Sequence, residues 1–184
     1  PSLVSKFISK FIDLSAFGKN LIEGILKIAI FIGYTALTAL TKDIRRTYEY
    51  HGAEHKTIAC YEHEEELTVE NVKKYTRFHP RCGTSFIFLV LFISIFVNTI
   101  FRVSWASILL RVVIKIALLP IVTGIAYELI RLAGKYDNIF TKIISAPGLW
   151  IQRITTSEPD ESQIECAIAA LKACIPENKE DDKW

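Results

Sequence analysis

Two short polar segments contain side chains of the types that bind transition-metal ions. In YEYHGAEHKT, His51 and His55 are four residues apart, so on a helix both imidazoles project from one face and can share one ion. Glu54 completes the pattern H-x-x-E-H, the reversed form of the zincin motif, where it can serve as general base, ligand or hydrogen-bond partner of a ligand. The second segment, FHPRCGT, places His79 and Cys82 three residues apart.

Together the two segments supply four ligands of the kind that zinc prefers, namely His51, His55, His79 and Cys82. If all four bind, the ion is structural; if three bind and water fills the fourth position, the site is catalytic, with Glu54 as the base. The alternative is that the histidines are surface or capping residues and the cysteine is a small packing residue. We interpret the set as a zinc site because both segments are expected at the same membrane face.

The elements that must position these residues are apolar helices. Residues 82–101 form a run of twenty without a charged side chain. At ~1.5 Å per residue, a helix of that length crosses a hydrocarbon core of roughly 30 Å. Two further apolar segments, 21–41 and 109–132, are also long enough to span, although their charge-free centres are shorter and buried soluble helices are the competing interpretation. The sequence therefore predicts an all-α polytopic membrane protein with three transmembrane helices.

The distribution of Lys and Arg predicts how the chain is oriented. Segment 42–81 contains eight of these residues, whereas the short turn 98–108 contains one, so the first is expected in the cytoplasm. The loop 42–81, which contains the predicted metal site, and the tail 133–184 then both lie on the cytoplasmic side. Segment 1–20 has an apolar face and is expected to be an amphipathic helix in the outer interface, or a linker to helices upstream.

Charged residues within the first and third spans need partners. We expect Glu23 to pair with Arg111 or Lys115 across the helices, with snorkelling of the basic side chains to the surface as the alternative. Glu128 can pair with Arg131 three residues later or contribute to the metal site, and the sequence favours the pair.

The tail is expected to contain one amphipathic helix. SAPGLWIQR predicts a turn at Pro147 and Gly148. An apolar stripe then precedes Pro176, which ends the helix; the stripe consists of Ile164, Ala167, Ile168, Leu171 and Ile175. This stripe must dock on the cytoplasmic loop, on a partner protein or on the membrane surface.

Several segments of the chain resemble one family. YHGAEHKTI, LTVENVKKYTRFHPRCGTSF, YELIRLAG, SAPGLWIQRIT and EPDESQIECAIAALKA are similar to the YqhQ-like family, bacterial membrane proteins of unknown function described as predicted metal-dependent enzymes. The resemblance implies a bacterial inner-membrane location and makes His51, Glu54, His55, His79 and Cys82 the family's signature polar positions. Family members also have an upstream region with a GGQAVIEGVMM-type segment and further apolar helices. Because the chain begins with Pro and has no Met, we expect that region to be missing here.

Two functions fit these observations. The first is an accessory or regulatory subunit of a membrane machine, such as one for protein insertion or export, in which zinc fastens the loop to the second span. The alternative is a metal-dependent hydrolase that uses the reversed zincin motif, so the pattern leaves open whether the protein is an enzyme. Expected partners are the lipid bilayer, the upstream helices, and either a membrane-protein complex or a second copy of the chain. A net charge of only +2 gives no support for nucleic-acid binding.

Overall fold

The computed structural model describes residues 4, 7, 8, 15–101, 107–136 and 138–176. Every regular element within these residues is a helix, which confirms the predicted all-α fold class. The segment predicted as an interfacial helix or linker, 1–20, falls for the most part outside the described residues. Its last residues, 16–20, belong to the first long helix.

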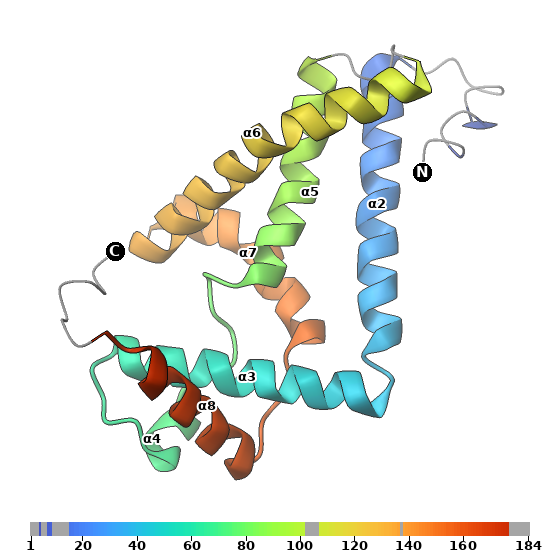
Figure 1. The fold of residues 1–184 in the computed structure, drawn as a ribbon. Coiled ribbons are helices and arrows are strands. Elements are labelled where there is room, and N and C mark those ends of the chain that lie inside the picture. Colours follow the sequence, from blue (N-terminus) through green and yellow to red (C-terminus); the bar gives the residue numbers. More distant parts are fainter. Residues whose placement is uncertain (1–3, 5–6, 9–14, 102–106, 137, 177–184) are drawn as a thin grey trace.

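Three helices are long and apolar enough to cross a membrane, as predicted. They are α2 (Ala16–Thr38), α5 (Gly83–Ile100) and α6 (Ile108–Lys135), and their ends differ by a few residues from the predicted spans 21–41, 82–101 and 109–132. Helices α2 and α6 both pack against α5, so α5 is the centre of the bundle (Figure 1). The core between α5 and α6 consists of Ile93, Val97, Leu118, Val122 and Ala126.

The charged residues within the spans form the expected pairs. Glu23 is 4% exposed, and its carboxylate oxygens lie 3.5 Å from Arg111 Nη1 and 3.4 Å from Lys115 Nζ. These contacts join the beginning of α2 to the beginning of α6. Glu128 lies 3.6 Å from Arg131 on the same helix, as the sequence favoured.

A second helical layer lies across one end of the spans. Helix α3 (Lys42–Glu62) lies across the end of α2, and α4 (Val69–Lys73) and α8 (Glu161–Cys174) pack against α3 (Figure 1). Their shared core consists of Ala53, Cys60, Val72, Ile164 and Ile168. The apolar stripe of the tail therefore docks on the loop between the first two spans, which was one of the three expected surfaces.

The expected turn at Pro147 and Gly148 is wrong. Both residues lie within α7 (Ile139–Thr155), a helix that the sequence did not predict, so the tail contains two helices. Pro147 removes one backbone donor from the helix, but packing of α7 against α5, α6 and α2 compensates. Gly148 allows this packing because a Cβ at that position would clash with the side chain of Ser85 on α5.

We predict that Glu23→Ala destabilises the bundle, because it removes the carboxylate that Arg111 and Lys115 both contact, and all three side chains are mostly buried. Removing one partner of a buried ion pair costs about 3 kcal/mol of unfolding free energy. The matched control is Glu128→Ala, whose carboxylate is 59% exposed and whose loss should cost at most about 0.5 kcal/mol. Denaturant unfolding in detergent micelles measures both, and equal costs would contradict an ion pair that holds α2 to α6.

Candidate metal centre

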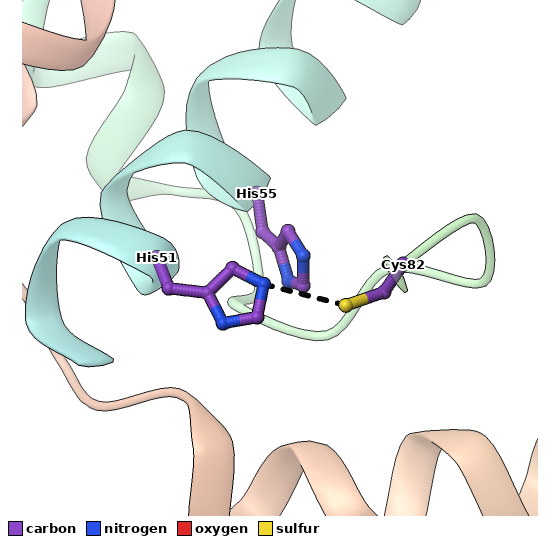
Figure 2. Close-up of side chains that lie close together, drawn as sticks. All are labelled: His51, His55 and Cys82. Carbon is purple, nitrogen blue, oxygen red and sulfur yellow. Dashed lines mark hydrogen bonds between the residues drawn. The ribbon is translucent and has the colours of Figure 1, made fainter. Parts of the chain in front are cut away.

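Three of the predicted ligands converge between the two layers. His51 and His55 extend from consecutive turns of α3, and Cys82 is the N-cap residue of α5 (Figure 2). One ligand atom from each of the three residues lies within 4.8 Å of the others, and His51 Nε2 is 3.3 Å from Cys82 Sγ. The imidazole rings of His51 and His55 have their centroids 4.3 Å apart. This arrangement of two imidazoles and one thiol can hold a metal ion.

Backbone carbonyls orient both imidazoles. His51 Nδ1 lies 2.8 Å from the carbonyl oxygen of Thr155, and His55 Nδ1 lies 2.7 Å from that of Arg77. A carbonyl oxygen only accepts, so each Nδ1 must carry hydrogen and donate it. The Nε2 atom of each ring is thereby left as the ligand atom. Histidines that bind metals usually donate their other ring N–H to such a partner, which fixes both tautomer and orientation.

The Cys82 thiol has a lowered pKa, which favours metal coordination. Burial alone would raise the pKa of Cys82, but hydrogen bonds with His51, His55 and Thr84 outweigh it and lower the pKa to about 5. Burial alone would lower the pKa of His51, yet its hydrogen bonds with the Cys82 sulfur and the Thr155 carbonyl raise it above the ordinary value. Because the thiolate is the form that binds metals, Cys82 is a competent ligand at neutral pH.

Gln152 holds the loop that carries Cys82. This side chain is completely buried in α7; its Oε1 accepts from the backbone N–H of His79 at 2.8 Å, and its Nε2 donates to the His79 carbonyl at 2.7 Å. The same Nε2 lies 2.8 Å from Ser85 Oγ. One amide thus fastens the loop to both α7 and α5. Sequence analysis missed Gln152 because it treated that segment as a turn, and a lone Gln carries no distinguishing signal.

Arg77 fixes the end of α7 next to the cluster. Its Nη1 donates to the Thr156 carbonyl at 2.6 Å, and its Nε lies 3.5 Å from Glu158. Lys56 of α3 pairs with the same Glu158 at 2.7 Å. The Arg77 carbonyl that orients His55 and the Thr155 carbonyl that orients His51 are therefore held by one connected polar network.

The fourth predicted ligand, His79, lies beside this cluster. Its ring centroid is 5.7 Å from that of His55. However, its Nε2 is 3.2 Å from a carboxylate oxygen of Glu62, and its Nδ1 accepts from the backbone N–H of Arg81 at 3.3 Å. Arg81 also pairs with Glu62. Both ring nitrogens of His79 are thus engaged by protein groups, and the structure brings together three ligands with His79 adjacent to them.

Glu54 is exposed and lies away from the ligand atoms. It lines a groove between α3 and α8 together with Tyr50, Cys166 and Leu171. Its charge contributes to the raised pKa of His51, after burial and the hydrogen bonds described above. The predicted general base therefore influences the cluster through space and faces a different surface.

The family of the chain follows from comparison with known proteins. The family described as "Protein of unknown function (DUF1385)" matches residues 1–177. The chain belongs to this family. It is also 42% identical over 155 residues to the uncharacterized protein YqhQ of Bacillus subtilis (strain 168), which confirms the resemblance to YqhQ-like proteins. No solved structure matches the chain.

The similarity to YqhQ covers 84% of this chain and 48% of the relative. The chain thus spans about half the length of the curated relative it matches. The family description and the relative's name state no activity. The chemistry of the site must therefore be inferred from its geometry.

We predict that Cys82 of the metal-stripped protein stays ionised down to about pH 5, because its lowered pKa keeps the thiolate above that pH. The measurement is the ultraviolet absorbance of the thiolate, taken as the difference between the protein and its Cys82→Ser variant during a pH titration. His51→Ala should move the midpoint toward the ordinary thiol value of about 8.5. A midpoint near that value in the unsubstituted protein would contradict the His51–Cys82 interaction.

Proposed function

We propose that the protein is a zinc-containing membrane protein in which the ion fastens the helical layer to the transmembrane bundle, and that it serves as an accessory or regulatory subunit of a membrane machine such as one for protein insertion or export. The observation that carries the zinc proposal is the convergence of His51, His55 and Cys82 with both imidazoles oriented by backbone carbonyls. Zinc suits the donor set because it binds thiolate and imidazole ligands in small tetrahedral sites.

A fastening role is supported by where the ligands originate. His51 and His55 belong to α3, which packs against α4 and α8, whereas Cys82 is the N-cap residue of the span α5. An ion held by all three would link the two layers directly. His55 and Cys82 are each only 4% exposed, so the cluster offers little surface to a substrate. Burial and cross-linking are features of structural rather than catalytic zinc.

A metal-dependent hydrolase is the second candidate, and one observation favours it. Three protein ligands leave one tetrahedral position for water or substrate, as in catalytic zinc sites. In that arrangement zinc acts as a Lewis acid and activates water for hydrolysis. Against this candidate, the predicted base Glu54 lines the groove between α3 and α8, and the cluster itself is largely buried. We therefore place the fastening role first.

We predict that the purified protein contains about one zinc ion per chain and that His51→Ala, His55→Ala and Cys82→Ser each weaken zinc binding by roughly 100-fold or more. Elemental analysis and competition with a chelator measure this directly. His63→Ala is the matched control, because this histidine is the C-cap residue of the same helix and its Nδ1 contacts the Ala59 carbonyl, outside the cluster. Full zinc content in all three ligand variants would contradict the site.

The coordination number and the Glu54→Gln variant separate the two roles. X-ray absorption of the zinc protein measures which atoms bind the ion. Four protein ligands, including a His79 nitrogen, would support fastening. Three protein ligands and one oxygen would support the hydrolase. Glu54→Gln should keep zinc and biological activity if the ion only fastens the layers, whereas a hydrolase that uses this base loses activity and keeps zinc. Purification from native membranes without a stable companion would count against the accessory role.

The zinc site and α8 are proposed to lie on the cytoplasmic side of a bacterial inner membrane. Support comes from the eight Lys and Arg residues of segment 42–81 and the single one between the second and third spans. Helix α8 packs on α3 and so belongs to the same side.

We predict that a membrane-impermeant maleimide labels Cys166 and Cys174 in inverted membrane vesicles and leaves them unlabelled in intact spheroplasts. Both thiols are exposed on α8, whereas Cys60 and Cys82 are buried. The variant Cys166→Ser/Cys174→Ser provides the background signal. Labelling of intact spheroplasts above that background would reverse the proposed orientation.

A further inference from the structure

Two adjoining cavities lie on the far side of the Cys82 loop, away from the ligands. The first, of about 700 Å³, lies between the loop, the last turn of α6 and helix α7. The second, of about 490 Å³, lies between α5, α6 and α7. Pro80, Ala133 and Ser145 line both, so the two cavities adjoin each other. Each volume falls within the range of roughly 300–1,000 Å³ typical of small-ligand sites.

The first cavity is basic. Lys135, Lys142 and Arg153 line it, and none of the described residues that line it carries a carboxylate. Tyr136 and Trp150 also line it, and Lys135 Nζ lies 5.9 Å from the centroid of the Tyr136 ring. Basic residues beside Tyr and Trp at the end of a transmembrane helix are typical of the level at which lipid headgroups lie.

The second cavity is apolar and runs along the spans. Its walls are mostly aliphatic and aromatic side chains, including Phe88 and Phe92 of α5, Leu129 and Ile130 of α6, and Ile143 of α7. Two of the helices that form these walls, α5 and α6, are long enough to cross a membrane. The first cavity therefore forms a cationic mouth and the second an apolar slot. A lipid has the same arrangement, with a charged headgroup followed by an apolar acyl chain.

We propose that this combined site binds one anionic glycerophospholipid, with its phosphate at Lys135, Lys142 and Arg153 and an acyl chain in the slot. Charge complementarity selects an anionic headgroup over a zwitterionic one, since three basic side chains line the same cavity. The slot selects a lipid over a free phosphate, because only an amphiphile fills both parts. The zinc ligands do not line the site, so lipid binding and zinc binding are separable.

The test is retention of lipid by the protein purified in mild detergent. The protein is mixed with equal amounts of phosphatidylglycerol and phosphatidylcholine, excess lipid is removed, and native mass spectrometry counts the lipids that remain bound. We expect one phosphatidylglycerol to be retained in preference to phosphatidylcholine. Each basic residue near an anionic group contributes roughly fivefold in affinity, so Lys135→Gln/Lys142→Gln/Arg153→Gln should lower retention by at least tenfold.

The matched control has the same change in net charge away from the cavities. Lys42→Gln/Arg45→Gln/Lys172→Gln alters three exposed basic residues on α3 and α8 and should retain phosphatidylglycerol like the unsubstituted protein. A second variant, Ala133→Trp, obstructs the junction of mouth and slot without removing a charge, and it should lose the bound lipid. Unchanged zinc content and melting temperature show that each variant is folded.

Three outcomes would overturn the proposal. Equal retention of both lipids by the unsubstituted protein would show that the mouth does not select an anion. An equal loss in the matched control would show that net charge alone attracts the lipid. Displacement of phosphatidylglycerol by an equal concentration of glycerol phosphate would show a site for a soluble anion, in which the slot has no part.

Discussion

The geometry of the site depends on two hydrogen bonds from histidine to backbone, those of His51 to Thr155 and of His55 to Arg77. Thr155 is the last residue of α7, and the last carbonyls of a helix have no partner within the helix. His51 satisfies one of these carbonyls, and Arg77 donates to that of Thr156 next to it. The end of α7 therefore obtains its hydrogen-bond partners from the same groups that form the cluster. A substitution that disturbs the end of α7 should therefore also disturb the cluster, and the reverse.

The two ends of the bundle are held by different chemistry. At one end, Glu23 joins α2 to α6 through two cations, in a setting where an unpaired charge is costly. At the other end, the Cys82 loop joins α5 to α3 through the hydrogen bond of His55 to the Arg77 carbonyl and the contact of His51 with Cys82. Backbone groups leave the apolar spans here and need partners. Helix α5 packs against α2, α6 and α7 between these two ends, and its N-cap residue is Cys82 of the cluster.

The sequence predicted what depends on local periodicity and charge. The three spans followed from the lengths of apolar runs, the Glu23 pair from the cost of charge in lipid, and the facing of His51 and His55 from the helical repeat. It could not predict α7, because Pro147 and Gly148 resemble a turn, and the packing of α7 against α5, α6 and α2 is not visible in the local sequence. The sequence could not predict the position of the His79 ring either. The segment from His79 to Cys82 is not helical, so their spacing says nothing about direction, and the ring of His79 turns to Glu62.

The loop between α4 and α5 lies between the two proposed sites, and its successive residues contact one site and then the other. Thr76, Phe78 and Pro80 line the basic cavity, whereas Arg77 contacts the end of α7 and His79 contacts Glu62. Alternate residues of this short loop therefore present two chemically different faces. One face is apolar enough to border lipid, and the other supplies the carbonyl that orients His55. The same short loop thus forms a wall of the proposed lipid cavity and a support of the His–Cys cluster, and two hydrogen bonds between Gln152 and the His79 backbone hold it against α7.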